Sequence, residues 1–203
     1  MIYSNPKKRI EMSEKHFFDS ALDEREQIPR HFTVTFEEVD TNGRAEVKVI
    51  INDSVQLGDI INDNTYQSDF YRYHDIFHYS FATLLGWSPC ARAMMKRKRK
   101  SNKLIDEIED GARATITEEA LSMIIFNEAK RKLFFSKNKK VSKTTLRIIK
   151  EMTENFEVRT RSSADWEFAI LKSYEIFRLL ITNNGGKVDF DMITKDIKFR
   201  TLN

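Results

Sequence analysis

The chain has few of the residues that cross-link or interrupt a fold. Its 203 residues include one cysteine, three prolines and six glycines. The single cysteine, Cys90, cannot form a disulfide within the chain, so nothing in the sequence indicates an oxidising compartment. So few prolines and glycines argue against a β-sandwich with many turns, and they favour long helices.

Long apolar runs are also absent. No run reaches the roughly 20 residues that a helix needs to span a bilayer. Residues 1–17 lack the apolar segment of a secretory signal. We therefore expect a cytoplasmic protein without a membrane partner. The formal net charge is only +3, so the overall charge does not call for nucleic acid.

Residues 1–64 are predicted to form an N-terminal part that packs on the rest of the chain. Its elements are a polar helix over residues 8–28, a β-hairpin over 32–38 and 45–51, and an acidic loop over 52–64. The hairpin is predicted because apolar and polar residues alternate on both sides of the turn residues Asp40 to Gly43.

Helical spacing of apolar residues dominates the remainder of the chain. Helices are predicted over residues 65–87, 90–100, 104–135, 144–156 and 164–182. Residues 183–186 end the last helix, and 188–202 are interpreted as a short strand or an irregular tail. The predicted fold class is mainly α, with a helical bundle over 65–203 preceded by a β-hairpin, in one globular domain.

The segment Tyr71–His78, with the sequence YRYHDIFH, brings together the side chains that most strongly indicate a functional site. On a helix, His74 and His78 lie one turn apart, and Asp75 lies within about 100° of them. Three groups that can bind a metal or move a proton then converge. A lone buried histidine is more often a satisfied core residue, but this triple arrangement favours function. His16 and His31 lack such neighbours and are interpreted as structural or surface residues.

A second cluster is acidic and comprises residues 106–110 with Glu118 and Glu119. On one continuous helix, Glu107, Asp110 and Glu118 fall within an arc of roughly 80°. Carboxylates on neighbouring helices commonly hold magnesium or manganese. Chance is a competing explanation, since 32% of the residues are charged, and we interpret Glu119 as merely solvated. An explanation by chance, however, would need two coincidences, because two such clusters lie on separate predicted helices.

Together the clusters resemble the all-α nucleoside triphosphate pyrophosphohydrolases of the MazG-like group. That group carries E-E-x-x-E on one helix and E-x-x-D on a following helix. Here residues 74–78, HDIFH, stand in place of the first motif, and 107–110, EIED, fit the second. A closer resemblance, over about residues 55–128, is to a set of bacterial MazG-related proteins. The shared segments are Gly58-Asp59, Asp63-Asn64, Tyr71-Arg72, His74-Asp75, Phe77-His78, Leu85 to Pro89, Lys96 to Ser101, Glu107, Glu109 to Gly111, Arg113-Ala114 and Glu118-Glu119.

The resemblance implies a metal-dependent enzyme that cleaves a nucleoside triphosphate to the monophosphate and pyrophosphate, acting as a homo-oligomer. The implied ligands of a divalent ion, Mg²⁺ or Mn²⁺, are Asp75, Glu107, Asp110 and His78. The implied catalytic residues are His74, His78 and Glu118, and the implied phosphate-binding residues are Arg72, Arg113 and Lys96. Because histidines replace two carboxylates of the first motif, a transition metal is an alternative.

Two other functions stay open. A phosphohydrolase of the HD type, built around a His-Asp pair, would need an upstream histidine such as His31, which falls in or beside a predicted strand. A catalytically silent sensor of nucleotides or nucleic acid would use the basic block Lys96–Lys100. No aromatic residues interleave that block as a stacking platform requires, so nucleic acid is not the favoured partner.

Overall fold

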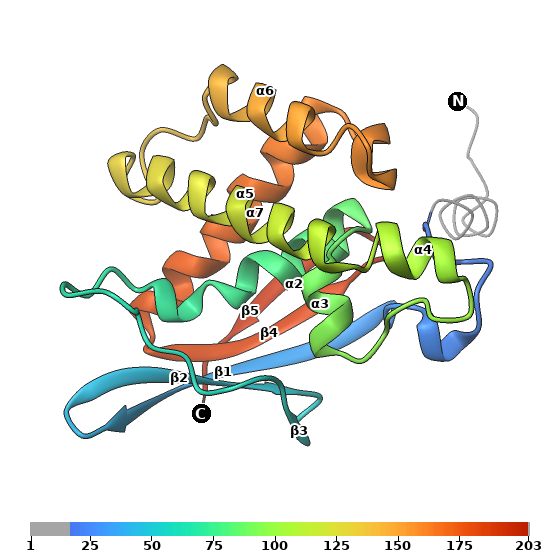
Figure 1. Ribbon diagram of the computed structural model, residues 1–203. Coiled ribbons are helices and arrows are strands. Elements are labelled where there is room, and N and C mark those ends of the chain that lie inside the picture. The colour runs from blue at the N-terminus through green and yellow to red at the C-terminus, as the bar shows by residue number, and fades with distance from the viewer. Residues whose placement is uncertain (1–16, 203) are drawn as a thin grey trace, which may run out of the picture.

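The computed structural model describes residues 17–202 and places the helices over one face of an antiparallel sheet (Figure 1). The five strands lie in the order β3-β2-β1-β4-β5. Their bounds are β1 His31–Thr41, β2 Arg44–Ile51, β3 Val55–Gln56, β4 Gly185–Asp191 and β5 Asp196–Arg200. The sheet therefore joins strands from the two ends of the chain, because β1 pairs with β4.

The helices form two layers above the sheet (Figure 1). Their bounds are α2 Asp75–Leu85, α3 Pro89–Met94, α4 Lys103–Ile108, α5 Ala112–Arg131, α6 Lys143–Met152 and α7 Ser163–Thr182, with short 3-10 turns η1 Glu24–Glu26, η2 Tyr71–Tyr73 and η3 Glu157–Thr160. Helices α2 and α7 pack on β4 and β5, whereas α5 contacts α3, α4 and α6. Helix α2 is thus enclosed between the sheet and the outer helices.

The predicted fold class, a mainly α bundle, is wrong. The C-terminal residues that were interpreted as a short strand or tail form the hairpin β4–β5, which extends the sheet beneath the helices. Gly185 has φ +116°, and a Cβ atom there would lie 2.4 Å from the carbonyl oxygen of Phe36. The glycine pair after α7 therefore does more than end a helix, because it lets the chain enter the sheet directly beside β1.

The predicted N-terminal β-hairpin is confirmed by β1 and β2. Thr41 pairs with Arg44, so the connection is the two residues Asn42 and Gly43. Both have positive φ, 57° and 78°, as the tight turn that matches the twist of a hairpin requires. Asp40 stabilises the turn, since its Oδ1 accepts a hydrogen bond of 2.7 Å from the Gly43 amide.

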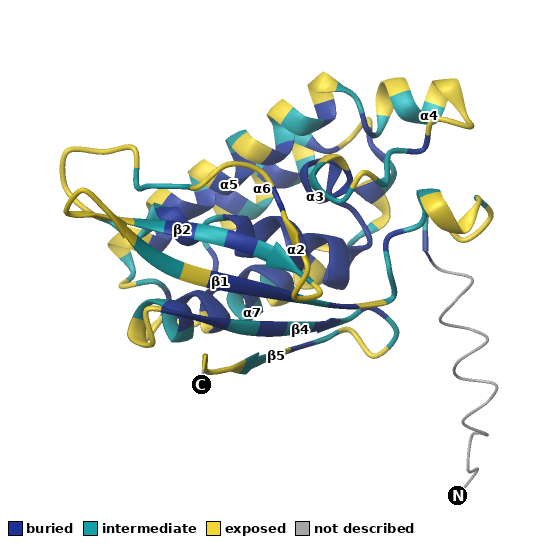
Figure 2. Cartoon of the chain, turned by 90° about the horizontal axis from the view of Figure 1, so that it is seen from below, coloured by how far each residue is buried: buried dark blue, intermediate teal, exposed yellow. Residues whose placement is uncertain are grey.

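The two faces of the sheet differ in polarity. Beneath the helices, Phe32 stacks on Phe190 at 4.7 Å between ring centroids, and Tyr79 of α2 meets the edge of Phe32. The opposite face, viewed in Figure 2, carries polar contacts such as the ion pair of Asp189 with Arg200. The sheet accordingly has one core face and one solvated face, as in many antiparallel sheets.

Three further predictions concern the ends and divisions of the chain. Residues 8–16 of the predicted N-terminal helix lie outside the described residues, and 17–28 form turns around η1. The division at residue 64 stays a prediction. Among residues 17–202, no helix combines the length and apolar character needed to cross a bilayer.

Candidate metal centre

The predicted catalytic segment lies where α2 begins. The chain turns through Phe70, which has φ +68°, into η2, and His74 is the N-cap of α2. All eleven residues of α2 are buried. Polar side chains on such a helix need partners within the protein, because a buried polar group without a hydrogen bond is costly.

His74 is held as a neutral ring with a defined tautomer. Its Nδ1 lies 3.0 Å from the carbonyl oxygen of Tyr71, and because a carbonyl only accepts, Nδ1 carries the proton. Burial lowers the pKa of His74 and outweighs the attraction of the neighbouring Asp75 carboxylate. The ring also stacks on Tyr71, at 4.2 Å between centroids. The lone pair of His74 therefore sits on Nε2, 3.4 Å from Asp75 Oδ1.

The pKa of His78 is shifted in the opposite direction to that of His74. Its Nδ1 donates a 2.8 Å hydrogen bond to Glu118 Oε1, and its Nε2 lies 3.5 Å from Glu119 Oε1. Burial alone would lower the pKa of His78, but the charges of Glu118, Glu119 and Asp75, together with the Glu118 hydrogen bond, raise it to about 9. Without another cation nearby, the site therefore retains a proton on His78 to balance converging carboxylates.

Glu118, predicted as catalytic, is fully buried and orients His78. Besides the imidazole, Ser88 Oγ donates to its Oε1 at 2.6 Å and the Cys90 amide donates to its Oε2 at 2.9 Å. Ser88 is the N-cap of α3, so the carboxylate lies at the start of that helix. With donors on both oxygens, Glu118 acts as a partner of His78 more readily than as a ligand.

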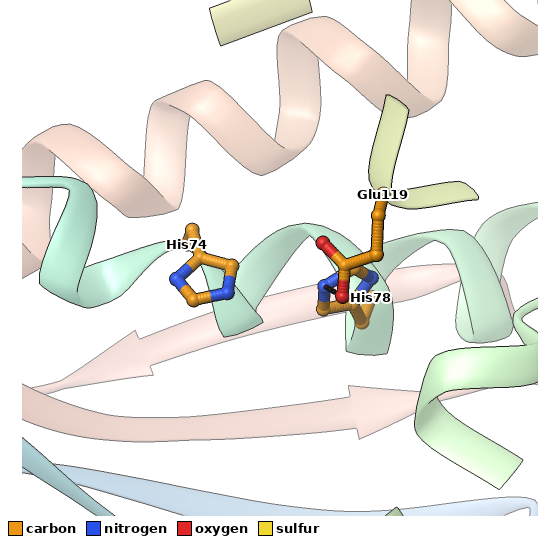
Figure 3. Close-up of side chains that lie close together, drawn as sticks. All are labelled: His74, His78 and Glu119. Carbon is orange, nitrogen blue, oxygen red and sulfur yellow. Dashed lines mark ion pairs between the residues drawn. The ribbon is translucent and has the colours of Figure 1, made fainter. Parts of the chain in front are cut away.

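Glu119, interpreted from the sequence as solvated, instead faces the histidines (Figure 3). Ligand atoms of His74, His78 and Glu119 all lie within 4.8 Å of one another. The Glu119 side chain is 47% exposed, so the cluster reaches solvent on this side. The sequence signal that could have indicated this arrangement is the pair of adjacent acids Glu118 and Glu119. Neighbouring residues on a helix point about 100° apart, so the two carboxylates can have different roles at one site.

The second predicted motif does not join this cluster, because the helix predicted over residues 104–135 is broken. It forms α4 and α5, separated by residues 109–111. A Cβ atom at Gly111 would lie 2.2 Å from the carbonyl oxygen of Glu107, so a side chain there would clash. The arc calculated for one continuous helix therefore does not apply. Glu107 projects from α4 with 62% exposure, and its ion-pair partner at 3.8 Å is Lys103.

Asp110 is buried in an ion-pair network of its own. It accepts bonds from the backbone amide of Arg99 at 2.7 Å and from Arg99 Nη2 at 2.8 Å. Arg92 Nε lies 3.8 Å from the same carboxylate. Asp110 is thus engaged in holding the segment before α5, and Arg99, from the predicted basic block, is a buried structural residue.

The three residues predicted to bind phosphate have different surroundings. The Arg72 guanidinium bonds to Glu38 Oε2 at 2.9 Å and to Asp63 Oδ2 at 3.0 Å, which fastens η2 to β1. Lys96 and Arg113 are exposed. His31 is 67% exposed and lies 3.5 Å from Asp191, so the structure does not place it as the upstream histidine of an HD-type site.

The donor set decides which ion fits. The ligand set that the resemblance implies, Asp75, Glu107, Asp110 and His78, does not assemble, since Glu107 and Asp110 lie in other surroundings. The atoms that do assemble are two imidazole nitrogens and a carboxylate oxygen. This set fits a divalent transition metal better than Mg²⁺, which prefers oxygen ligands.

The fold and this cluster define an α+β domain with a histidine–carboxylate centre between α2 and α5. The chain belongs to the MazG C-terminal domain family, whose model matches residues 13–203. The resemblance to MazG-related proteins over about residues 55–128 is thereby confirmed, and the match extends it over nearly the whole chain. Neither a curated protein nor a solved structure matches the chain.

Proposed function

We propose that the protein is a divalent-metal-dependent hydrolase that cleaves a nucleoside triphosphate to the monophosphate and pyrophosphate. The observation that carries the proposal is the convergence of Asp75, His74, His78 and Glu119 at a partly open site on an otherwise buried helix. Membership of the MazG C-terminal domain family supports a nucleotide as the substrate.

The residues of the cluster have distinct roles in this proposal. A divalent ion, when bound, would polarise a phosphoryl oxygen and neutralise the charge that develops there. Asp75 Oδ1, 3.4 Å from His74 Nε2, would orient the attacking water and accept its proton. Glu118 would hold the imidazole of His78 in place through the 2.8 Å bond to Nδ1.

The test is a panel of nucleoside triphosphates incubated with Mg²⁺, Mn²⁺ and Zn²⁺ in parallel, with release of pyrophosphate as the measurement. We expect turnover of at least one substrate, and loss of turnover by at least about 100-fold in Asp75→Asn, as for removal of a general base. The matched control is Glu107→Gln, which alters an exposed carboxylate on α4 and should retain activity.

One result would count against the hydrolase, and another against the role of Asp75. Nucleotide binding without turnover under any metal would favour the sensor alternative. Equal activity in wild type and Asp75→Asn would remove the proposed base. The homo-oligomeric state stays a prediction, and gel filtration with light scattering measures it directly.

A further inference from the structure

His74, the N-cap of α2, and His78, within α2, each have one ring nitrogen that already takes part in a hydrogen bond. The Nδ1 of His74 donates to the Tyr71 carbonyl at 3.0 Å, and the Nδ1 of His78 donates to Glu118 at 2.8 Å. In each ring this leaves Nε2 as the atom that can bind a metal ion. Metal-bound histidines in proteins show the same arrangement, in which the second nitrogen bonds to a carbonyl or a carboxylate.

The free atoms lie at a spacing that suits shared coordination. Nε2 of His78 is 3.5 Å from Glu119 Oε1, and one ligand atom from each of His74, His78 and Glu119 lies within 4.8 Å of the other two. Ligands at about 2.1 Å from a tetrahedral ion lie about 3.4 Å from one another. The half-exposed Glu119 side chain can turn its carboxylate toward the rings, whereas each ring is held at Nδ1 by its hydrogen-bond partner.

We propose that His74 Nε2, His78 Nε2 and the Glu119 carboxylate form a centre for a first-row transition metal ion such as Zn²⁺ or Mn²⁺. The centre selects against Mg²⁺, because two of its three donors are nitrogen. Three protein ligands would leave further coordination positions for water or a substrate oxygen. The inference rests on the proposed function only where it assigns the metal a role in hydrolysis. Metal binding itself does not depend on that function.

A second group of potential ligands lies on the other side of His78 and consists of His78, Cys90 and Glu118. There Glu118 already accepts bonds from the imidazole, Ser88 and the Cys90 amide. A metal at that position would have to displace buried donors and leave them unsatisfied, which is costly. The geometry therefore favours the side of His78 that faces Glu119.

The experiment measures metal binding without reference to hydrolysis. The 203-residue protein is treated with a chelator, dialysed, and titrated separately with Zn²⁺, Mn²⁺ and Mg²⁺ by calorimetry, with bound metal measured by mass spectrometry. We expect a single Zn²⁺ or Mn²⁺ per chain, with no displacement by excess Mg²⁺. His74→Gln and Glu119→Gln should each weaken binding by at least about tenfold, since each removes a ligand.

Matched controls separate this centre from adventitious binding. His31→Gln alters an exposed histidine beside Asp191, and Glu107→Gln alters an exposed glutamate; both should bind like wild type. Circular dichroism confirms that each variant is folded. Binding that is unchanged in folded His74→Gln or Glu119→Gln, binding that is lost in His31→Gln, or displacement by Mg²⁺ would overturn the proposal. Metal binding without nucleotide turnover would support this centre while contradicting the hydrolase.

Discussion

His78 donates its Nδ1 proton to Glu118 across 2.8 Å, in a place where both side chains are almost wholly buried. The pair links α2 to α5 and, through Ser88 and the Cys90 amide, to the start of α3. The Glu118 carboxylate therefore connects three helices through its hydrogen bonds. The pair is both the support of the candidate metal centre and a part of the core.

Glu118→Gln should lower the free energy of unfolding on the order of 3 kcal/mol, because it removes one charge of a buried, hydrogen-bonded pair. Urea denaturation of metal-free protein at neutral pH measures the effect. The adjacent Glu119→Gln is the matched control, since its half-exposed carboxylate contributes less to stability. Equal stability of wild type and Glu118→Gln would show that the pair does not stabilise the fold.

Metal-free protein should lose stability as the pH rises from 6.5 to 9. Burial would lower the pKa of His78, but the charges of Glu118, Glu119 and Asp75 and the Glu118 hydrogen bond raise it from its ordinary 6.5 to about 9. A raised folded-state pKa stabilises fully below the unfolded value, and the contribution disappears as the pH passes the folded value.

The measurement for this pH effect is urea denaturation between pH 6 and 9.5. His78→Asn is the control, because its amide keeps a donor near Nδ1 but does not titrate. The slope of stability against pH should be flatter in the variant. Parallel slopes in both proteins would assign the pH dependence to other groups.

Asp110→Asn should destabilise the fold without removing the metal site. Asp110 bonds to the backbone and side chain of buried Arg99, and loss of one partner in such a pair costs about 3–5 kcal/mol. We expect a lower midpoint of urea unfolding, but an unchanged metal content in the folded protein. Selective loss of metal from folded Asp110→Asn would instead make this residue a ligand, as the motif resemblance implied.

Gly111→Ala should cost about 1–3 kcal/mol of stability, the usual range for overpacking. The new methyl group would meet the carbonyl oxygen of Glu107 at 2.2 Å, so α4 and α5 would have to move apart. Gly58→Ala is a useful comparison, because that glycine has positive φ but no atom within 4 Å of a new Cβ. If Gly111→Ala is as stable as wild type, the break between the helices does not depend on this close approach.

Local patterns were sufficient for several elements of this protein. Alternation around Asn42-Gly43 predicted the hairpin β1–β2, because the turn type and the pleat are both set by neighbouring residues. The spacing of His74 and His78 predicted that both would face one site, since one helical turn separates them. The motifs of residues 55–128 were sufficient for the family, which the match over residues 13–203 confirms.

Other features depend on contacts between distant residues. Residues 188–202 read as a strand or a tail because their pairing partner, β1, lies about 150 residues earlier in the chain. Which carboxylate lies opposite His74 and His78 depends on the orientation of α5 after the break at Gly111. The spacing of charges along one assumed continuous helix did not predict that orientation.

The sequence by itself determined the family, the first hairpin and the two histidines on one helical face, because each depends on residues close together in the chain. Only the tertiary structure decided that Glu119 lies opposite those histidines, while Asp110 pairs with Arg99 and Glu107 faces solvent. The physical reason is that a carboxylate becomes a potential ligand, a structural ion pair or a solvated charge according to the groups packed against it.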